Sequence, residues 1–453
     1  MRQLSRNCLG KHCIGNNRRE TISDTAPHIS EMMPAQSRKA RIAGVIGNVV
    51  EWYDFALYGY LAVIIGRLFF PTEDPTASLL ASYGVFAAGF IMRPLGAVVF
   101  GWLGDTIGRG RTMLISVAMM ALPTIMLGLL PDYNSIGIAA PILLILVRLV
   151  QGLSVGGEFS SSVTYMVETA PDDQRGRAGS WANVGSMLGM LLGSAAAALV
   201  TSLLPNEALE AWGWRLPFLF GGVLGLSALI LRRSLPQSPH FKAHEAGTPS
   251  MSPFRQVWNE NRKEMVQAFL FAAGYGMMFY LIMVYLPGWL SRHSSLEDAH
   301  ALQINSVLTL MTIPLMVVFA WVGDVWIRRT HLIAGALIML TLLAWPLGVL
   351  MLNGAPIQIV AAQAILVLLI CVPLGLAPAT FVELFPSSDR LTGYSISFNL
   401  GIGVLGGATP MLATWLIDIT LQPIMPAALM ILSGLVATGS LLWMSDRSRE
   451  PLR

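Results

Sequence analysis

Long apolar stretches alternate with short polar connections along most of the chain, from residue 41 to residue 444. Each stretch has roughly the twenty residues that an α-helix needs to cross the hydrocarbon core of a bilayer, which is about 30 Å thick. We therefore predict an all-α membrane protein with twelve transmembrane helices. The predicted helices cover, to within several residues, 42–68, 78–104, 112–130, 138–165, 178–204 and 214–231, and then 265–290, 302–323, 331–351, 356–383, 392–417 and 424–444.

The polar stretches divide the chain into two bundles of six helices with polar parts around them. The stretch between the bundles is rich in proline, serine and charge, which is typical of a linker. The predicted parts are residues 1–40 (polar leader), 41–231 (first bundle), 232–264 (linker), 265–444 (second bundle) and 445–453 (tail).

Two charged patterns occur once in each predicted bundle, in the same order. One is an aspartate four residues before an arginine, and the other is E-x-x-P-x-x-x-R. Such a repeat indicates a duplicated six-helix unit, which is the architecture of transporters that move one half against the other. The residues are Asp105, Arg109, Glu168, Pro171 and Arg175 in the first bundle and Asp324, Arg328, Glu383, Pro386 and Arg390 in the second.

The composition supports a membrane location and excludes several other classes. Hydrophobic residues make up 54% of the chain and charged residues only 12%, against about 25% charged in a typical soluble protein. A net charge of +3 is too small to indicate a nucleic-acid partner. Neither the three cysteines nor the seven histidines show the spacing of a metal site, and no nucleophile constellation is present. We therefore expect no cofactor, no metal and no enzymatic activity.

The lysine and arginine residues predict how the chain is oriented. With twelve spans, both termini lie on one side, and that side receives 24 of the 29 basic residues. By the positive-inside rule both termini are then cytoplasmic. We expect a multi-pass protein of the bacterial cytoplasmic (inner) membrane that functions as a monomer in the lipid bilayer.

Four ionisable residues, Glu51, Asp54, Arg93 and Arg148, fall near the middle of predicted helices in the first bundle. At 1.5 Å per residue, Arg93 is about 18 Å from the predicted cytoplasmic residue Asp105. A charge at such depth is costly, so these residues either carry a function or form a structural ion-pair cluster. We favour a function, because glycine, alanine and serine hold membrane helices together at lower cost.

The chemistry of these residues suggests a proton site next to a substrate site. Glu51 and Asp54 lie three residues apart on one helical face, and two like charges this close favour a proton on one of them. The planar guanidinium of Arg93 suits a substrate carboxylate. Arg148 and Glu158 lie on one stripe of the fourth predicted helix, together with Gln151.

The second bundle contributes aromatic and polar candidates. Tyr275, Phe279 and Tyr280, with Trp289 further out, either form an aromatic core or interface belt, or line the wall of a substrate cavity. In a cavity wall, such rings suit a quaternary ammonium group. Asn399 in the eleventh predicted helix is a further candidate hydrogen-bond donor to substrate.

Several segments resemble one family of transporters. The segment GWLGDTIGRGR at residues 101–111 resembles the signature of the major facilitator superfamily. The other segments are similar to its metabolite:proton symporters, the group that includes α-ketoglutarate permease, the citrate symporter and the proline/betaine transporter. These segments are GNVVEWYDFALYG (47–59), GFIMRPLGAVVFG (89–101), RLVQGLSVGGEF (148–159), WGWRLPF (212–218) and ELFPSSDRLTGYSISFN (383–399).

The resemblance implies a twelve-helix major facilitator fold, alternating access and proton-coupled symport. It associates the R-x-x-Q-G segment with proton coupling. We expect the paired charges at the cytoplasmic ends to latch the halves together in the outward-open state. The expected sets are Glu51, Asp54, Arg148 and Glu158 for proton coupling, Arg93, Arg148, Gln151, Tyr275, Phe279, Tyr280 and Asn399 for substrate, and Asp105, Arg109, Glu168, Arg175, Asp324, Arg328, Glu383 and Arg390 for gating.

We expect the substrate to be a small organic acid of the di- or tricarboxylate kind, taken up with protons. The alternative within transport is a zwitterionic osmolyte such as proline or glycine betaine. The aromatic residues of the seventh helix support this alternative. Efflux of a metabolite or drug is less favoured by the family segments. The sequence lacks the nucleophile or metal constellation that a membrane-embedded enzyme needs. A purely structural scaffold does not account for charges at mid-depth.

Overall fold

Every regular element in the described part of the chain is helical. The computed structural model describes residues 26–233, 253–294 and 298–452. Within these ranges, eleven helices are long and apolar enough to cross a membrane, and the bent pair Arg41–Tyr60 and Ala62–Phe69 makes a twelfth span. The predicted all-α architecture with twelve spans is therefore confirmed. The predicted leader and linker lie largely outside the described residues.

The first six spans form an N-terminal half. Its first span is bent by 67° between α1 and α2. The helices of this half are α1 (Ala26–Tyr60), α2 (Ala62–Phe69), α3 (Pro75–Thr106), α4 (Arg109–Leu129), α5 (Tyr133–Ile136), α6 (Ala139–Glu168), α7 (Arg175–Leu203), α8 (Asn206–Ala208) and α9 (Arg215–Arg232), with the short helical segments η1 (Asp172–Gln174) and η2 (Leu209–Gly213).

The last six spans form a C-terminal half, and two of them contain a π-helical segment. The seventh span runs through α12, η3 and α13, and the eleventh through α17, η4 and α18. A π-helical segment adds a residue to the helical turn and is frequent at functional sites. The elements are α11 (Pro253–Glu260), α12 (Arg262–Phe279), η3 (Tyr280–Tyr285), α13 (Leu286–His293), α14 (Asp298–Val325), α15 (Arg329–Asn353), α16 (Pro356–Leu384), α17 (Arg390–Phe398), η4 (Asn399–Gly406), α18 (Gly407–Thr420) and α19 (Met425–Trp443).

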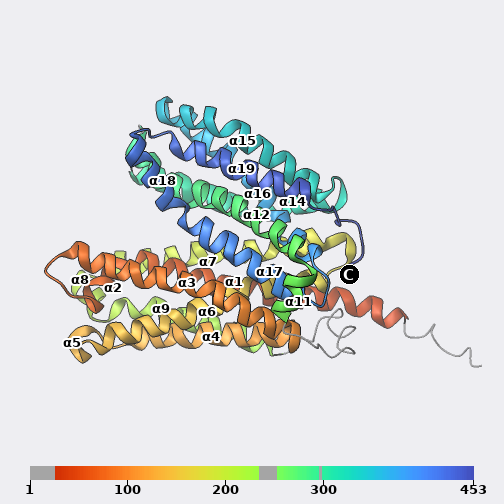
Figure 1. Cartoon of the computed structure of the whole chain (residues 1–453). Helices are drawn as coiled ribbons and strands as arrows, with labels where there is room; N and C mark the ends of the chain where they lie inside the picture. The colour runs from red at the N-terminus through yellow and green to blue at the C-terminus, as the bar shows by residue number, and fades with distance from the viewer. Residues whose placement is uncertain (1–25, 234–252, 295–297, 453) are drawn as a thin grey trace, which may run out of the picture.

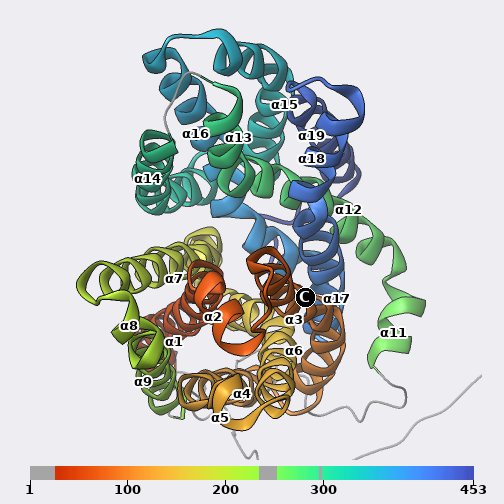
Figure 2. The same cartoon turned by 90° about the vertical axis from the view of Figure 1, so that its left-hand side faces the viewer.

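The two halves lie side by side and meet mainly at one end (Figures 1 and 2). There α7 packs against α14 and α16, and α3 packs against α17. We call this the closed end; it carries α11 and the C-terminus. At the other end, which carries α5, α8 and α18, the halves spread apart, and we call it the open end.

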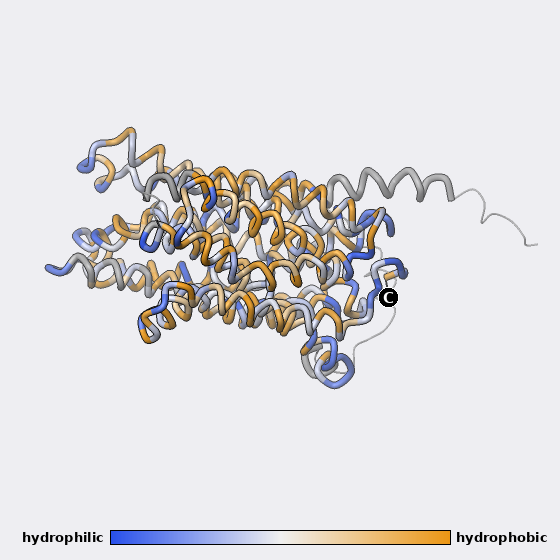
Figure 3. Tube along the Cα trace, turned by 90° about the horizontal axis from the view of Figure 1, so that it is seen from above, coloured by the Kyte–Doolittle hydropathy of each residue, from blue (hydrophilic) through white to orange (hydrophobic). Residues whose placement is uncertain are grey.

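An apolar zone surrounds the middle of the bundle. Figure 3 shows hydrophobic segments along the centre of the helices and hydrophilic segments at both ends. Large hydrophobic side chains such as Leu203 and Leu442 are exposed on the outside. In water such exposure is unfavourable, and in a bilayer these side chains contact lipid.

Two glycines of α6 allow its backbone to touch α3 beside the central arginine of that helix. A Cβ atom at Gly152 would lie 2.1 Å from the carbonyl oxygen of Gly89, and one at Gly156 would lie 2.2 Å from that of Arg93. Any side chain at these positions would force α3 and α6 apart. Small residues at membrane helix contacts permit such close packing.

Candidate functional site

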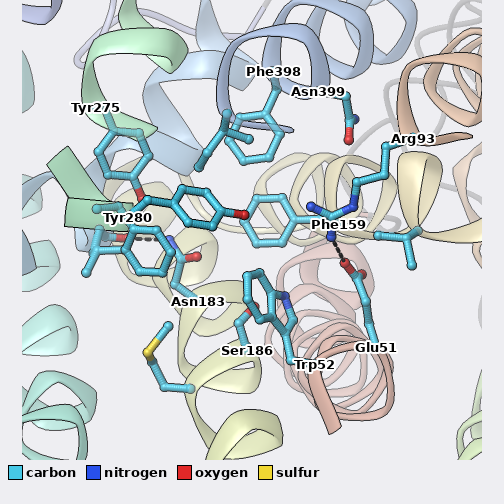
Figure 4. A pocket seen from close by; sticks show the side chains of 15 residues that line it. Glu51, Trp52, Arg93, Phe159, Asn183, Ser186, Tyr275, Tyr280, Phe398 and Asn399 are labelled. Atoms are coloured by element: carbon cyan, nitrogen blue, oxygen red, sulfur yellow. Dashed lines mark hydrogen bonds and ion pairs between the residues drawn. The ribbon is translucent and has the colours of Figure 1, made fainter. Parts of the chain in front are cut away.

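A small cavity of about 30 Å³ lies between the halves (Figure 4). This volume accommodates little more than a water molecule or two, so side chains must move before a larger solute enters. Its walls come from α1, α3, α6 and α7 of one half and from α12, η3, α16, α17 and η4 of the other. The lining residues are Glu51, Trp52, Arg93, Val155, Phe159, Asn183, Ser186, Met187, Tyr275, Phe279, Tyr280, Leu374, Phe398, Asn399 and Ile402.

A larger cavity of about 550 Å³ lies toward the open end. Phe86, Phe90 and Ile91 of α3 form one wall, and residues of η3, η4 and α18 form the other; none of the lining residues is charged. Tyr280 lines both cavities. It therefore stands between the larger cavity and the central one.

Glu51 of α1 and Arg93 of α3 form an ion pair on the wall of the central cavity. Glu51 Oε1 and Arg93 Nη2 are 3.2 Å apart, and both side chains are buried. Among the described residues, Glu51 Oε2 and Arg93 Nε have no hydrogen-bond partner. Rings of Phe55 and Phe90 lie 5.1 and 5.0 Å from the guanidinium carbon, a favourable cation–π distance. The pair thus retains hydrogen-bonding capacity that a ligand can use.

Asp54 lies one helical turn further along α1 and has an arginine of its own. Arg148 Nη1 donates to Asp54 Oδ2 at 2.8 Å, and Gln151 Nε2 and Thr124 Oγ1 both donate to Oδ1 at 3.0 Å. The guanidinium carbon of Arg148 lies 4.3 Å from the centre of the Tyr58 ring. None of these residues lines the central cavity. The two carboxylates of the first span are thus paired with different arginines, which the expectation of one like-charge pair did not foresee.

Glu158 belongs to a third buried ion pair, nearer the closed end. Arg232 Nη1 and Nη2 donate to its two carboxylate oxygens at 2.8 and 2.5 Å, and Ser116 donates a short hydrogen bond to the same carboxylate. We expected Arg232 in the linker, but it is the last residue of α9 and is buried. The signal that sequence reasoning missed is the unbroken apolar segment that leads directly into this arginine.

The aromatic candidates of the seventh span face the central cavity. Tyr275, Phe279 and Tyr280 line it, and the Tyr280 hydroxyl faces the guanidinium of Arg93 across it (Figure 4). Trp289 does not take part: its Nε1 donates to the carbonyl oxygen of Pro423 at 2.8 Å. Tyr275, Phe279 and Tyr280 are buried in the hydrophobic core and also line the cavity, which argues against an interface belt; their part in binding substrate stays a prediction.

Asn399 connects the two halves on the closed-end side of the cavity. Its Nδ2 donates to the carbonyl oxygens of Gly156, in the other half, and of its own neighbour Ser395, at 2.8 and 2.9 Å. Beside it, the rings of Phe159 and Phe398 stack with their centres 5.1 Å apart. These contacts close the cavity on the side of the closed end, and they already occupy the donor that we expected to bind substrate.

Three lining residues that carry a polar group, Trp52, Asn183 and Ser186, were not predicted from the sequence. Trp52 has a buried Nε1 without a hydrogen-bond partner. Asn183 Nδ2 donates to the carbonyl oxygen of Leu374 at 2.7 Å, and Ser186 lies on the same helix. No charge or motif marks these positions in the sequence, because their contribution depends on which helix faces turn inward.

Two similar charged clusters join the halves at the closed end. In the first, Arg390 Nη1 lies 2.7 Å from Glu168 Oε1, and Arg109 Nε lies 3.5 Å from the same oxygen. In the second, Arg329 Nη2 and Arg175 Nη1 lie 2.8 and 3.0 Å from Glu383 Oε1. Each cluster has two residues from one half and one from the other.

Two aspartates bind the starts of helices that belong to the opposite half. Asp105 accepts hydrogen bonds from the backbone N–H of Thr392 at 2.9 Å and from its hydroxyl at 2.6 Å, at the start of α17. Asp324 accepts from the N–H groups of Gly176 and Arg177, both at 2.9 Å, at the start of α7. A carboxylate at a helix N-terminus is stabilised by the unpaired N–H groups and the helix dipole.

Arg328 does not join these clusters. Its half-exposed side chain lies 3.4 Å from Asp446. The neighbouring Arg329, at the first position of α15, is buried and takes the place that we expected for Arg328. The seven other predicted gating residues all lie in the two clusters or cap a helix of the other half.

Asp389, directly before α17, adds a carboxylate that titrates near neutral pH. Burial, together with the nearby charges of Asp105 and Glu260, raises the pKa of Asp389 to about 7. Asn261, between α11 and α12, donates to Asp389 Oδ2 at 2.8 Å. The last part of the predicted linker, which includes Asn261, thus contacts the closed end.

Comparisons with known proteins agree with the fold and identify the family. The family described as "Sugar (and other) transporter" matches residues 40–251. The chain is 32% identical to the glycine betaine/proline/ectoine/pipecolic acid transporter OusA of Dickeya dadantii over 92% of this chain and 85% of that protein. It is 33% identical to a putative proline/betaine transporter of Staphylococcus aureus, over 89% and 88% of the two chains.

The solved structures show the same fold. The proton:xylose symporter XylE, bound to 6-bromo-6-deoxy-D-glucose, superposes with a TM-score of 0.75 at 16% identity, over 90% of this chain and 96% of that one. At this level of identity the likeness concerns the arrangement of helices and not the solute.

Proposed function

This chain belongs to the major facilitator superfamily, in its metabolite:proton symporter family, and we propose that it imports a zwitterionic osmolyte such as proline or glycine betaine together with protons. The chain is a multi-pass membrane protein and a secondary transporter. The choice of solute rests on the charge of the central cavity and is supported by the names of the relatives.

The single observation that carries the proposal is the charge balance of the cavity lining. Among its lining residues one is cationic, Arg93, and one is anionic, Glu51. A di- or tricarboxylate would bring two or three negative charges against one arginine that is already paired, and buried uncompensated charge is costly. A zwitterion adds no net charge. The organic acid that we first expected is therefore the less favoured solute.

The lining also offers a partner for each end of a zwitterion. The carboxylate fits the guanidinium of Arg93, which has an unused Nε–H donor. The positive end fits the aromatic faces of Trp52, Tyr275, Phe279 and Tyr280, which attract an alkylated ammonium group by cation–π interaction. Arg148, the second arginine that we expected at the substrate, is held by Asp54 outside the cavity.

Proton coupling follows from competition between the substrate carboxylate and Glu51 for Arg93. When the substrate carboxylate takes the Arg93 donors, Glu51 loses its counter-charge and accepts a proton, because a buried unpaired carboxylate is costly. The loaded cavity then carries one net positive charge, that of Arg93 with its zwitterionic ligand, and the halves rotate about the site. When substrate leaves, Glu51 releases the proton and pairs with Arg93 again. Each cycle moves one solute and one proton in the same direction.

We infer that the closed end faces the cytoplasm. It carries most of the basic residues, in accordance with the positive-inside rule. The structure then corresponds to an outward-facing state with its cytoplasmic end latched. The charged clusters and the helix caps must separate before solute is released, and a few kcal/mol suffice to shift such an equilibrium.

Uptake into proteoliposomes tests the proposal. Labelled proline and glycine betaine are compared with citrate and α-ketoglutarate, with and without an acid-outside gradient. We expect accumulation of a zwitterion that the gradient increases. Uptake of a carboxylate in place of the zwitterions refutes the solute class, and uptake that ignores the gradient refutes proton coupling.

Two variants assign the roles in the same assay. Glu51→Gln should retain solute exchange across the membrane and lose gradient-driven accumulation, because it cannot release a proton. Arg93→Lys keeps the charge and loses the planar fork, so the apparent affinity should fall. Arg67→Ala is the matched control, since Arg67 is exposed and paired with Glu210.

A further inference from the structure

We propose that residues 444–452, which follow α19, act as a strap that holds the closed end shut. These residues leave the C-terminal half, run over the second charged cluster and reach the N-terminal half. This inference depends on the alternating-access fold and not on the identity of the solute.

The strap is anchored to the C-terminal half at three points. Arg328 lies 3.4 Å from Asp446, and Arg447 Nη1 donates to the carbonyl oxygen of Leu384, the last residue of α16, at 3.0 Å. Arg329 Nη2 donates to the carbonyl oxygen of Ser448 at 2.6 Å. This part of the chain therefore moves with the C-terminal half.

The fourth contact crosses to the other half. Arg175, the first residue of α7, donates from Nη1 to the carbonyl oxygen of Glu450 at 2.8 Å. The same guanidinium pairs with Glu383 of the C-terminal half, and it is almost fully buried. Movement of α7 away from α16 must break the hydrogen bond to Glu450 or pull the strap from its anchors.

The first charged cluster shows why the second needs the strap. There the carbonyl groups come from the connection between α16 and α17: Arg109 donates to Ser387 at 2.8 Å and Arg390 donates to Phe385 at 3.3 Å. In the second cluster, Arg329 and Arg175 donate instead to carbonyl groups of the strap. The strap therefore replaces a connection that would otherwise satisfy these buried donors.

Loss of the strap should favour opening of the closed end. It takes one acceptor away from each of two buried arginines, and it removes one charge-assisted hydrogen bond between the halves. A hydrogen bond to a charged group changes an equilibrium constant by about tenfold. Removal should therefore raise the population of the state that is open at this end by about tenfold.

A buried serine pair between the halves provides a reporter. Ser395 of α17 is fully buried and contacts Ser160 of α6 through their hydroxyl groups. In a chain whose three native cysteines are replaced by serine, Ser395→Cys should react with a polar maleimide only when the closed end opens. The labelling rate is measured in nanodiscs, where both ends are accessible.

The test compares a shortened chain with matched side-chain variants. A stop codon in place of Asp446 removes the strap from residue 446 onward, with all four of its contacts, and should speed labelling about tenfold. Arg447→Ala, which removes one anchor, should change the rate in the same direction by less. Arg449→Ala and Glu450→Ala should leave it unchanged, because both side chains are exposed and the contact uses the backbone carbonyl of Glu450.

Gel filtration of each variant confirms that it is folded before labelling. An unchanged labelling rate in the folded shortened chain would overturn the strap. A Glu450→Ala variant that labels as fast as the shortened chain would also overturn it. The contact with Arg175 would then depend on the charge of the Glu450 side chain and not on its backbone carbonyl group. If the shortened chain does not fold, Arg447→Ala decides the question alone.

Discussion

Arg232→Ala removes a guanidinium on which several buried groups of the N-terminal half depend. Arg232 donates two hydrogen bonds to the Glu158 carboxylate, two to the carbonyl oxygen of Ala43 in α1 and one to that of Met113 in α4. Ser116 donates to the same carboxylate. The arginine therefore joins α1, α4, α6 and α9 in one polar network, and the substitution leaves Glu158 as a buried charge without a counter-charge.

The expected cost follows from this geometry. Removal of one partner from a buried ion pair destabilises a protein by about 3–5 kcal/mol. With about 2 °C per kcal/mol in larger domains, the midpoint of thermal unfolding should fall by about 6–10 °C. The double variant Arg232→Met with Glu158→Gln removes both charges and should lose much less. Arg233→Ala is the matched control, because Arg233 is exposed.

Thermal unfolding of the protein in one detergent measures all four proteins. If Arg232→Ala melts like the native chain, or if the double variant melts as low as the single one, the account of a satisfied ion pair is refuted. Proton-driven uptake by the double variant adds a second readout. Retained coupling would assign Glu158 a structural role, whereas lost coupling in a folded protein would support the proton role that we expected from the sequence.

Further expectations concern the same network and the closed end. Gly47→Ala should lower the midpoint of thermal unfolding, because its Cβ would lie 1.8 Å from Arg232 Nη2. Gly59→Ala is the control, because no atom lies within 4 Å of its Cβ. Equal midpoints for the two variants would contradict the packing around Gly47. Asp105→Asn should speed the labelling of the Ser395→Cys reporter about fivefold, because the helix dipole loses about 1 kcal/mol of charge interaction; an unchanged rate would count against the cap. Because the folded-state pKa of Asp389 is raised to about 7, its contribution to stability is present below its ordinary pKa and is lost as pH rises through 7. Asp389→Asn should therefore reduce the loss of thermal stability between about pH 5 and 8, and identical pH profiles would refute this assignment.

Hydrophobicity predicted the twelve spans, because each needs only a sufficient apolar length. The two halves and their related charges also follow from spacing alone. Spacing does not show which side chains of a helix point into the protein, however. For this reason the sequence predicted Arg328 in the charged cluster, where the structure has Arg329. Since α15 begins at Arg329, that side chain points inward and its neighbour points to solvent.

The partners of the mid-depth charges required the packed structure. Glu51 and Asp54 are close in sequence, but α3 brings Arg93 to one and α6 brings Arg148 to the other. Arg232 looked like a linker residue, because nothing local shows that Glu158 needs a cation. The contacts of the chain after α19 were equally invisible, since they use backbone carbonyl groups that every residue has.

The neutral pair of Glu51 and Arg93 has an electrical consequence. In the proposed cycle the empty carrier returns with a net charge of zero in its cavity, and the loaded carrier bears one added proton on a zwitterion complex. Each turnover therefore carries one positive charge inward. A membrane potential of 100 mV, negative inside, contributes about 2.3 kcal/mol per charge, roughly a fiftyfold concentration ratio, even when the two sides have the same pH. The voltage across the membrane would then act as a driving force in its own right.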